Sequence, residues 1–203
     1  MSNQPLIAVD VVPVSYSPPD GIRFGVTERQ HAPYAGRLAL PGVLLGGDER
    51  LEAAVYRALE SKSRVSPAEV RHLTQIGAFD LPGRDPREHA VSVAFVAVVS
   101  PGAGELTWDR QPASLPFDHD SIVGAAREQL RVRLWTDTAL TRALLGDRFT
   151  TTDAVNVEHQ LTGVSPHAPN VLRRLVADPR LVRDPRGVAS SRGKPRAVFT
   201  WAD

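Results

Sequence analysis

Hydrophobic residues gather in short runs that predict the strands of a sheet. The segment LIAVDVVPVSY (6–16) is rich in valine and isoleucine, and the turn signal PPDG separates it from a second run, IRFGVTER (22–29), so a hairpin is expected. Further runs at 70–82 and 90–100 predict two more strands, and the second is apolar enough to be buried. A short strand or sheet edge is expected at GELTWD.

Other segments show the period of an amphipathic helix. In RLEAAVYRALES the apolar positions are spaced by three and four residues and form one stripe. Its members are Leu51, Ala54, Val55, Ala58 and Leu59. The stretch from Asp120 to about Leu145 predicts two helices, with Thr136 or Asp137 as a cap between them. Strands, a helix, strands and a helix pair together predict an α/β sandwich of roughly 145 residues.

The pattern changes after this sandwich. Residues 149–163 predict a capped helix, and residues 165–179 predict a second one that starts near Pro169, because proline is favoured at the first helical position. A short strand, a basic loop and a closing strand, AVFTW, follow. Two short helices and a hairpin with a basic tip are typical of a winged helix-turn-helix. The expected domain ranges are 1–146 and 147–203.

Composition and charge limit what such a protein can do. The chain has 203 residues, no cysteine, and no apolar run near the roughly 18 residues needed to cross a membrane. Disulfides, thiolate zinc sites and a cysteine nucleophile are excluded, and the start does not resemble a signal peptide, so we expect a cytoplasmic protein without membrane attachment. The net charge is only +1, but residues 165–200 carry 8 basic and 2 acidic side chains. Such a region is expected of a nucleic-acid-binding module, or of a solvated tail.

A motif between residues 36 and 65 carries candidate phosphate chemistry. Leu40-Pro41-Gly42 precedes Glu49 and Arg57. With the strands around it, this stretch resembles the box of a Nudix hydrolase, a loop-helix-loop on which glutamates hold a divalent metal against a pyrophosphate. The resemblance implies a Nudix-type α/β/α sandwich. A plain core helix would explain the apolar stripe, but it explains the matches in register less well.

The metal ligands of that box are missing. Its later glutamate positions carry Ala58, Ser61 and Lys62, and a lysine would repel a cation placed beside it. We therefore expect no metal site, no catalytic residue and no cofactor. The alternative is a Nudix diphosphatase that acts on ADP-ribose-like substrates through atypical metal ligands. The candidates for that set are Glu49, Glu52 and Glu60.

Further stretches extend the resemblance over almost the whole chain. GAFDLPGRDPREHAVSVAFVAVV (77–99) is similar to part of the ADP-ribose-type Nudix proteins. LPFDHDSIV (115–123) is similar to a signature of the Nudix-related transcriptional regulators, often called NrtR. The C-terminal pattern of that family is matched by Phe149-Thr150, by Asn170 with Arg173 and Arg174, and by Gly193-Lys194-Pro195-Arg196 with Phe199. The resemblance implies a Nudix domain that senses a ligand, followed by a winged helix.

The sensing half offers candidate contacts to a nucleotide. Guanidinium forks match phosphate oxygens, aspartate and histidine can hydrogen-bond a ribose or a base, and an ammonium at the former metal position would neutralise part of a pyrophosphate. The expected ligand-binding residues are Arg37, Lys62, Arg84, Asp85, Arg87, Asp118 and His119. A turn aspartate at Asp85 and a helix cap at Asp118 are plainer explanations for two of them.

The C-terminal half is expected to bind double-stranded DNA as a homodimer, because winged-helix regulators generally bind two-fold operators. The candidate contacts on the second helix and the wing are Asn170, Arg173, Arg174, Arg192, Lys194 and Arg196. The resemblance further implies that ADP-ribose or a related nucleotide is the effector, that genes of NAD metabolism are the targets, and that the protein is a repressor. A pocket that has drifted to another ligand, or to none, is a third hypothesis.

Overall fold

The computed structural model describes residues 4–185, 187 and 196–202. The chain divides into two compact units. The sheet unit comprises Met1–Ser15 and Arg23–Gln129, and the C-terminal unit comprises Tyr16–Ile22 and Leu130–Asp203. The turn between the first two strands therefore packs with the C-terminal unit. The domain ranges expected from the sequence stay a prediction about independently folding parts.

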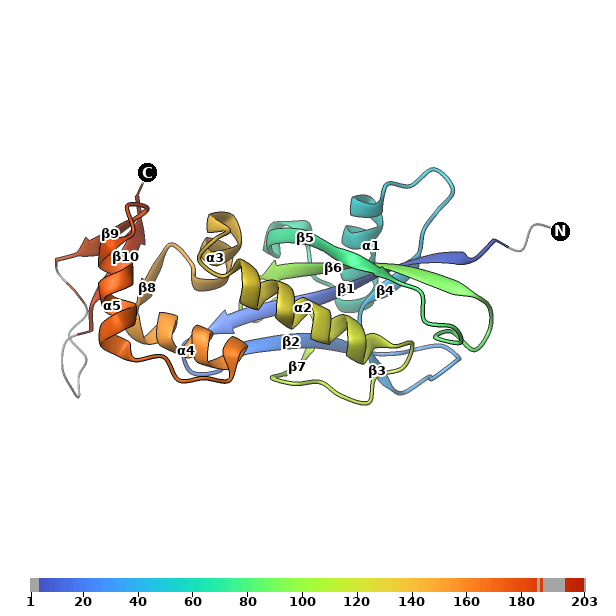
Figure 1. The fold of residues 1–203 in the computed structure, drawn as a ribbon. Helices are drawn as coiled ribbons and strands as arrows, with labels where there is room; N and C mark the ends of the chain where they lie inside the picture. The colour runs from blue at the N-terminus through green and yellow to red at the C-terminus, as the bar shows by residue number, and fades with distance from the viewer. Residues whose placement is uncertain (1–3, 186, 188–195, 203) are drawn as a thin grey trace. The chain divides into compact units, whose positions relative to one another are not determined.

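The sheet unit is built on a mixed sheet that has seven strands within the described residues (Figure 1). Its order is β3-β2-β1-β6-β5, with β4 paired to β1 and β7 to β2, and β1 and β6 run parallel. The strands are β1 (Leu6–Ser17), β2 (Gly21–Glu28), β3 (Leu38–Ala39), β4 (Gly42–Leu44), β5 (Val70–Phe79), β6 (Ala90–Val99) and β7 (Thr107–Asp109). Central β1 is buried from Val9 to Tyr16, and a strand covered on both faces has a nearly continuous apolar run. The expected strands are confirmed, although β5 ends three residues early.

Helix α1 (Leu51–Ser63) packs on one face of this sheet through the stripe seen in the sequence. Ala54, Val55, Ala58 and Leu59 are fully buried, and each fully buried Val or Leu side chain contributes roughly 1.5–3 kcal/mol. Their sheet partners are Val9, Val11, Phe95, Ala97 and Val99. The helix stops where Arg64 takes the left-handed conformation (φ 54°), and the short 3₁₀ turn η1 (Pro67–Glu69) leads into β5. Helix α2 (His119–Arg133) runs across the strands (Figure 1).

The C-terminal unit contains the helix pair and the hairpin expected from the sequence. Its helices are α3 (Thr138–Leu145), α4 (Thr151–Thr162) and α5 (Ala168–Ala177), and its strands are β8 (Arg148–Thr150), β9 (Leu181–Asp184) and β10 (Val198–Trp201). Asp137 caps α3 by accepting from Leu140 N at 3.0 Å, as expected. Residues 148–150 form an edge strand of an antiparallel sheet ordered β8-β10-β9, rather than the first turn of a helix.

Aromatic rings fill the centre of this unit. Phe149 stacks on Phe199 with 6.0 Å between ring centroids, and Trp201 lies 5.8 Å from Phe149. Both phenylalanines are buried, so β8 and β10 close over the helices through these rings. Among the described residues, no helix is both long and apolar enough to cross a membrane.

Asp153 ties the start of α4 to two other segments. Its carboxylate accepts hydrogen bonds from Thr150 N at 2.8 Å and Thr150 Oγ1 at 2.7 Å, which closes a capping box, and from Tyr16 Oη at 2.8 Å. Near the other end of α4, Gln160 Oε1 accepts from Ile22 N at 2.7 Å. The β1–β2 turn is therefore hydrogen-bonded to α4 at two points.

Asp153→Ala should lower the free energy of unfolding by about 2 kcal/mol, because it removes a helix cap and the buried acceptor of the Tyr16 hydroxyl. Tyr16→Phe removes a single hydrogen bond and should cost about 1 kcal/mol. Urea unfolding followed by circular dichroism measures both. A stability of Asp153→Ala equal to that of the wild type would contradict this role of the cap.

Candidate functional site

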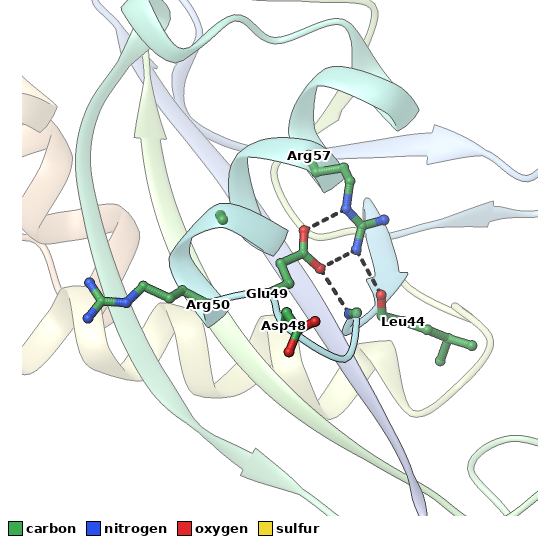
Figure 2. A pocket seen from close by; sticks show the side chains of 7 residues that line it. Leu44, Asp48, Glu49, Arg50 and Arg57 are labelled. Atoms are coloured by element: carbon green, nitrogen blue, oxygen red, sulfur yellow. Dashed lines mark hydrogen bonds and ion pairs between the residues drawn. The ribbon is translucent and has the colours of Figure 1, made fainter.

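An ion pair fastens the loop after β4 to helix α1 (Figure 2). Glu49 accepts from Arg57 Nε at 2.7 Å and from Arg57 Nη2 at 2.6 Å, while Gly46 N donates to Glu49 Oε2 at 3.0 Å. Arg57 also donates to Leu44 O at 2.8 Å. The hydrogen bonds from Arg57, and then from Gly46 N–H, lower the pKa of Glu49 to about 2. Glu49 and Arg57 therefore hold the loop, at the wall of a cavity of about 690 Å³.

The box helix does not present the ligands of a divalent metal. Ala58 is fully buried, and Ser61 and Lys62 are exposed on the last turns of α1. Glu52 and Glu60 are eight residues apart on this helix, which is about 12 Å along its axis, so they cannot share one cation. Across residues 4–185, 187 and 196–202, no cluster of three His, Cys, Asp or Glu side chains could hold a metal ion. The residues present therefore do not fit the metal of an active Nudix box.

A buried carboxylate, Asp10 on β1, pairs with side chains from three other segments of the sheet unit. It accepts from Ser92 Oγ at 2.6 Å and from Arg84 Nη2 at 3.3 Å, and His119 Nε2 lies 3.5 Å away. Burial raises the pKa of Asp10, but His119, Ser92 and Arg84 outweigh burial and lower it to about 2. Arg84 and His119, both expected to touch a ligand, thus lie inside the unit and pair with Asp10.

The same carboxylate explains the Leu-Pro-Gly motif. Leu40 N donates to His119 Nδ1 at 3.0 Å, and Val11 N donates to Pro41 O at 2.9 Å. A Cβ at residue 42 would lie 2.1 Å from an Asp10 oxygen, so only glycine leaves room there. The motif positions the chain around Asp10.

The other expected ligand residues lie nearer the surface. Asp85 is buried and holds the exposed Arg87 by two bonds, from Nε at 3.0 Å and from Nη2 at 2.7 Å. Arg37 Nη2 donates to a backbone carbonyl, Ser114 O, at 2.5 Å. Asp118 accepts from Ser121 Oγ at 2.5 Å, which is the cap-like contact considered from the sequence. Lys62 lies apart on α1, where its backbone carbonyl accepts from Thr27 Oγ1 at 2.9 Å.

Three residues that sequence reasoning missed join these arginines. The Phe117 ring lies 4.5 Å from the Arg29 guanidinium and 5.9 Å from that of Arg87, and Tyr34 meets it edge-on with centroids 5.0 Å apart. Arg37 in turn lies 5.5 Å from the Tyr34 ring. We call Arg29, Tyr34, Arg37, Arg87 and Phe117 the Phe117 cluster. Phe117 belongs to the Phe-Asp-His motif, which was the available signal, whereas Arg29 and Tyr34 carry no motif.

On α5 the two neighbouring arginines have different surroundings. Arg174 forms an ion pair with Glu158 of α4 and lies 5.4 Å from the Trp135 ring, and Trp135 Nε1 donates to Glu158 Oε1 at 2.8 Å. Arg173 and Asn170 are exposed and hydrogen-bond to each other. Arg196 is exposed just before β10, and the expected contacts Arg192 and Lys194 lie outside the described residues. Asn170 and Arg173 therefore form the available polar face of the helix, and Arg174 holds α5 to α4.

Arg180 holds the turn between α2 and α3, which contains Trp135 and which we call the Trp135 corner. Its guanidinium donates to Trp135 O and to Thr138 Oγ1, both at 2.8 Å, and it pairs with Asp178 at 2.6 Å. Trp135 itself has a left-handed backbone (φ 71°), which costs energy in a residue with a side chain. This corner is thus held by contacts from α4, α5 and the turn before β9.

Comparison with known proteins adds two kinds of relative. No family model matches the chain. An ADP-ribose pyrophosphatase of Methanocaldococcus jannaschii is 31% identical over 105 residues, and the match covers 47% of this chain and 60% of that enzyme. The chain therefore spans less than two thirds of this relative's length.

Solved structures match much more of the chain. The crystal structure of Shewanella oneidensis NrtR complexed with a 27mer DNA has a TM-score of 0.76 and 25% identity, and the match covers 97% of this chain and 93% of that one. The Nudix domain of the same protein complexed with ADP ribose has a TM-score of 0.54 and 28% identity, over 63% of this chain and 89% of that one. The expected fold, a Nudix-type α/β domain followed by a C-terminal domain, is confirmed.

Arg174→Ala should lower the free energy of unfolding by about 1 kcal/mol, because it removes a half-exposed ion pair and the contact with the Trp135 ring. The neighbouring Arg173→Ala is the matched control and should change stability by less than about 0.5 kcal/mol. Thermal unfolding followed by tryptophan fluorescence compares the two. Equal losses would contradict the assignment of Arg174 to the interior contact.

Proposed function

We propose that this chain, an NrtR-type Nudix-related regulator by fold and domain order, is a transcriptional repressor that binds DNA and responds to ADP-ribose or a related nucleotide. The observation that carries the proposal is the match to the NrtR–DNA complex over 97% of the chain, because it includes both units in the same order. The proposed domains are a Nudix-like sensor at 1–146 and a winged helix-turn-helix at 147–203. The proposed targets are genes of NAD metabolism.

The DNA-binding half is supported by the helix pair and its charge. Helix α5 presents Asn170 and Arg173, whose amide and guanidinium are the groups that read adenine and guanine in the major groove. Residues 165–200 carry 8 basic and 2 acidic side chains, which favours a phosphate backbone as the partner. Arg196 suits phosphate contact beside the recognition helix, as do Arg192 and Lys194 from the sequence. A homodimer on a two-fold operator, in the cytoplasm, completes the proposal.

Nucleotide sensing without hydrolysis is supported by the fold of the sheet unit and by the missing metal ligands of its Nudix-like box. The neighbouring Nudix domain was solved with ADP ribose, so this fold accommodates such a ligand. In this chain the former metal positions are Ala58, Ser61 and Lys62, and Glu49 is already paired with Arg57. A nucleotide held here keeps its diphosphate bond, because hydrolysis in this fold depends on clustered carboxylates and a metal.

The second candidate function is a Nudix diphosphatase. The 31% identity to an ADP-ribose pyrophosphatase is the observation in its favour. The separation of Glu52 and Glu60 on α1 and the engagement of Glu49 speak against it. We therefore rank the regulator first.

The protein should retard DNA from the region upstream of its own gene in a gel shift, and ADP-ribose should release that DNA. Arg173→Ala should weaken binding by at least about tenfold, because one lost guanidinium contact to a base costs roughly 1–3 kcal/mol. Arg71→Ala, which removes an exposed arginine of β5, is the control and should bind as the wild type does. Absence of any retarded fragment would count against a DNA-binding regulator.

Incubation with ADP-ribose and Mg²⁺ or Mn²⁺ should give no multiple turnover, since the residues that the structure describes hold no carboxylate cluster able to bind a metal. Ser61→Glu with Lys62→Glu should make nucleotide binding depend on metal, because both positions are exposed near the end of α1 and a pair of carboxylates attracts a divalent cation. Ala58 is unsuitable for this test, because a glutamate there would be placed in the core. Chromatographic detection of AMP over many turnovers in the wild type would instead support the diphosphatase.

A further inference from the structure

Two guanidiniums of the Phe117 cluster are not balanced by a carboxylate contact. Arg29 donates to Pro33 O at 2.9 Å and His31 O at 3.3 Å, and Arg37 donates to Ser114 O. These partners are neutral carbonyls. Within the described part of the chain, neither arginine forms an ion pair. Their guanidiniums are therefore held in place by carbonyl oxygens, without a carboxylate in direct contact.

Like charges are also held close together. Arg29 and Arg87 both face the Phe117 ring. Burial and then the charge of Arg87 lower the pKa of Arg29, while Asp85 and Asp10 act in the opposite direction without outweighing them. Asp85 compensates one of these charges, by pairing with Arg87. A surplus of positive charge remains around one ring.

Two further features lie at the Phe117 cluster: a strained backbone and the buried side chain of Arg84. Four residues with side chains take the left-handed conformation here: Tyr34 (φ 65°), Ser114 (φ 60°), Phe117 (φ 61°) and Asp118 (φ 61°). Such strain costs of order 1 kcal/mol or more per residue and is concentrated at binding sites. Below them, Arg84 donates to Phe117 O at 2.9 Å, and its Nε is buried without a hydrogen-bond partner. Its side chain is only 3% exposed.

We propose that the Phe117 cluster is an oxyanion site, in which Arg29, Arg37 and Arg87 hold the diphosphate of a nucleotide and Tyr34 and Phe117 form an apolar wall beside it. Guanidinium forks match phosphate oxygens in pairs and remain charged at every physiological pH. The site would supply by arginine the neutralisation that a metal supplies in an active Nudix box. As the location of the effector it rests on the proposed function, but binding of the anion can be measured without DNA.

The test is isothermal titration calorimetry on the full chain with ADP-ribose, AMP, inorganic pyrophosphate and adenosine. We expect ADP-ribose to bind tightest, pyrophosphate to compete with it, and adenosine to bind weakly. Arg37→Gln and Arg87→Gln should each weaken ADP-ribose binding about tenfold, and the double variant about a hundredfold. Both side chains are exposed, so folding should persist, as circular dichroism can verify.

Arg71→Gln is the matched control, since it removes the same charge from an exposed arginine whose Nε donates to Ser100 Oγ, and it should bind as the wild type does. Lys62→Gln tests the alternative that the phosphates are held by Lys62 on α1 instead of by the Phe117 cluster. A tenfold loss in that variant, with the double arginine variant within threefold of the wild type, overturns the proposal. Binding of none of the four probes by the wild type overturns it as well.

A gel shift in parallel separates this proposal from the regulatory one. DNA that is retarded and then released by ADP-ribose in both the wild type and Arg37→Gln/Arg87→Gln overturns the site and leaves the regulator intact. Loss of ADP-ribose binding in the double variant, with no DNA retarded by the wild type, supports the site and counts against the regulator.

Discussion

The buried carboxylate of Asp10 is the constraint around which the sheet unit arranges its loops. A charge withdrawn from water costs several kcal/mol unless neighbours compensate it. Here the compensation comes from the turn after β5, from β6 and from α2, through Arg84, Ser92 and His119. Gly42 adds the close approach of β4. One carboxylate on a central strand therefore joins the turn that carries Arg84, strand β6 and the start of α2 next to Phe117.

The elements of this fold follow from local patterns, but the direction of its charged side chains does not. The stripe from Ala54 to Leu59 and the apolar run of β1 are visible in any short window, because burial of a helix face or a central strand repeats with its own period. Arg84 and Arg87 stand in one turn, yet the first is buried and the second is half exposed. What separates them is Asp10, 74 residues away from Arg84, and no local pattern contains that information.

In the segment that resembles a Nudix box, the residues that hold the loops are present and the residues that would bind a metal are not. Glu49 and Arg57 persist because their ion pair holds the loop to α1, and Leu40-Pro41-Gly42 persists because it surrounds Asp10 and His119. Of the positions that would serve a metal ion, Ser61 and Lys62 are exposed on α1, whereas Ala58 is buried in the core. The Ala58 side chain adds apolar burial against the sheet. The loss of the metal ligands is visible in the sequence. The structural roles of Glu49, Arg57 and Leu40-Pro41-Gly42 are visible only in the hydrogen bonds of the folded chain.

A nucleotide can release DNA only if the two ligands prefer different states of the chain. Each tenfold loss of DNA affinity on nucleotide binding then requires about 1.4 kcal/mol of coupling, and DNA must weaken nucleotide binding by the same factor. Helix α2 is a continuous segment of 15 residues that begins next to Phe117 and Asp118 and ends just before the Trp135 corner. After its last residue the chain reaches Trp135, whose indole donates to Glu158 and lies against the Arg174 guanidinium. Phe117, just before this helix, and Trp135, just after it, both have a left-handed backbone. For the proposed release of DNA, α2 is therefore the continuous segment whose two ends adjoin the proposed oxyanion site and the Trp135 corner.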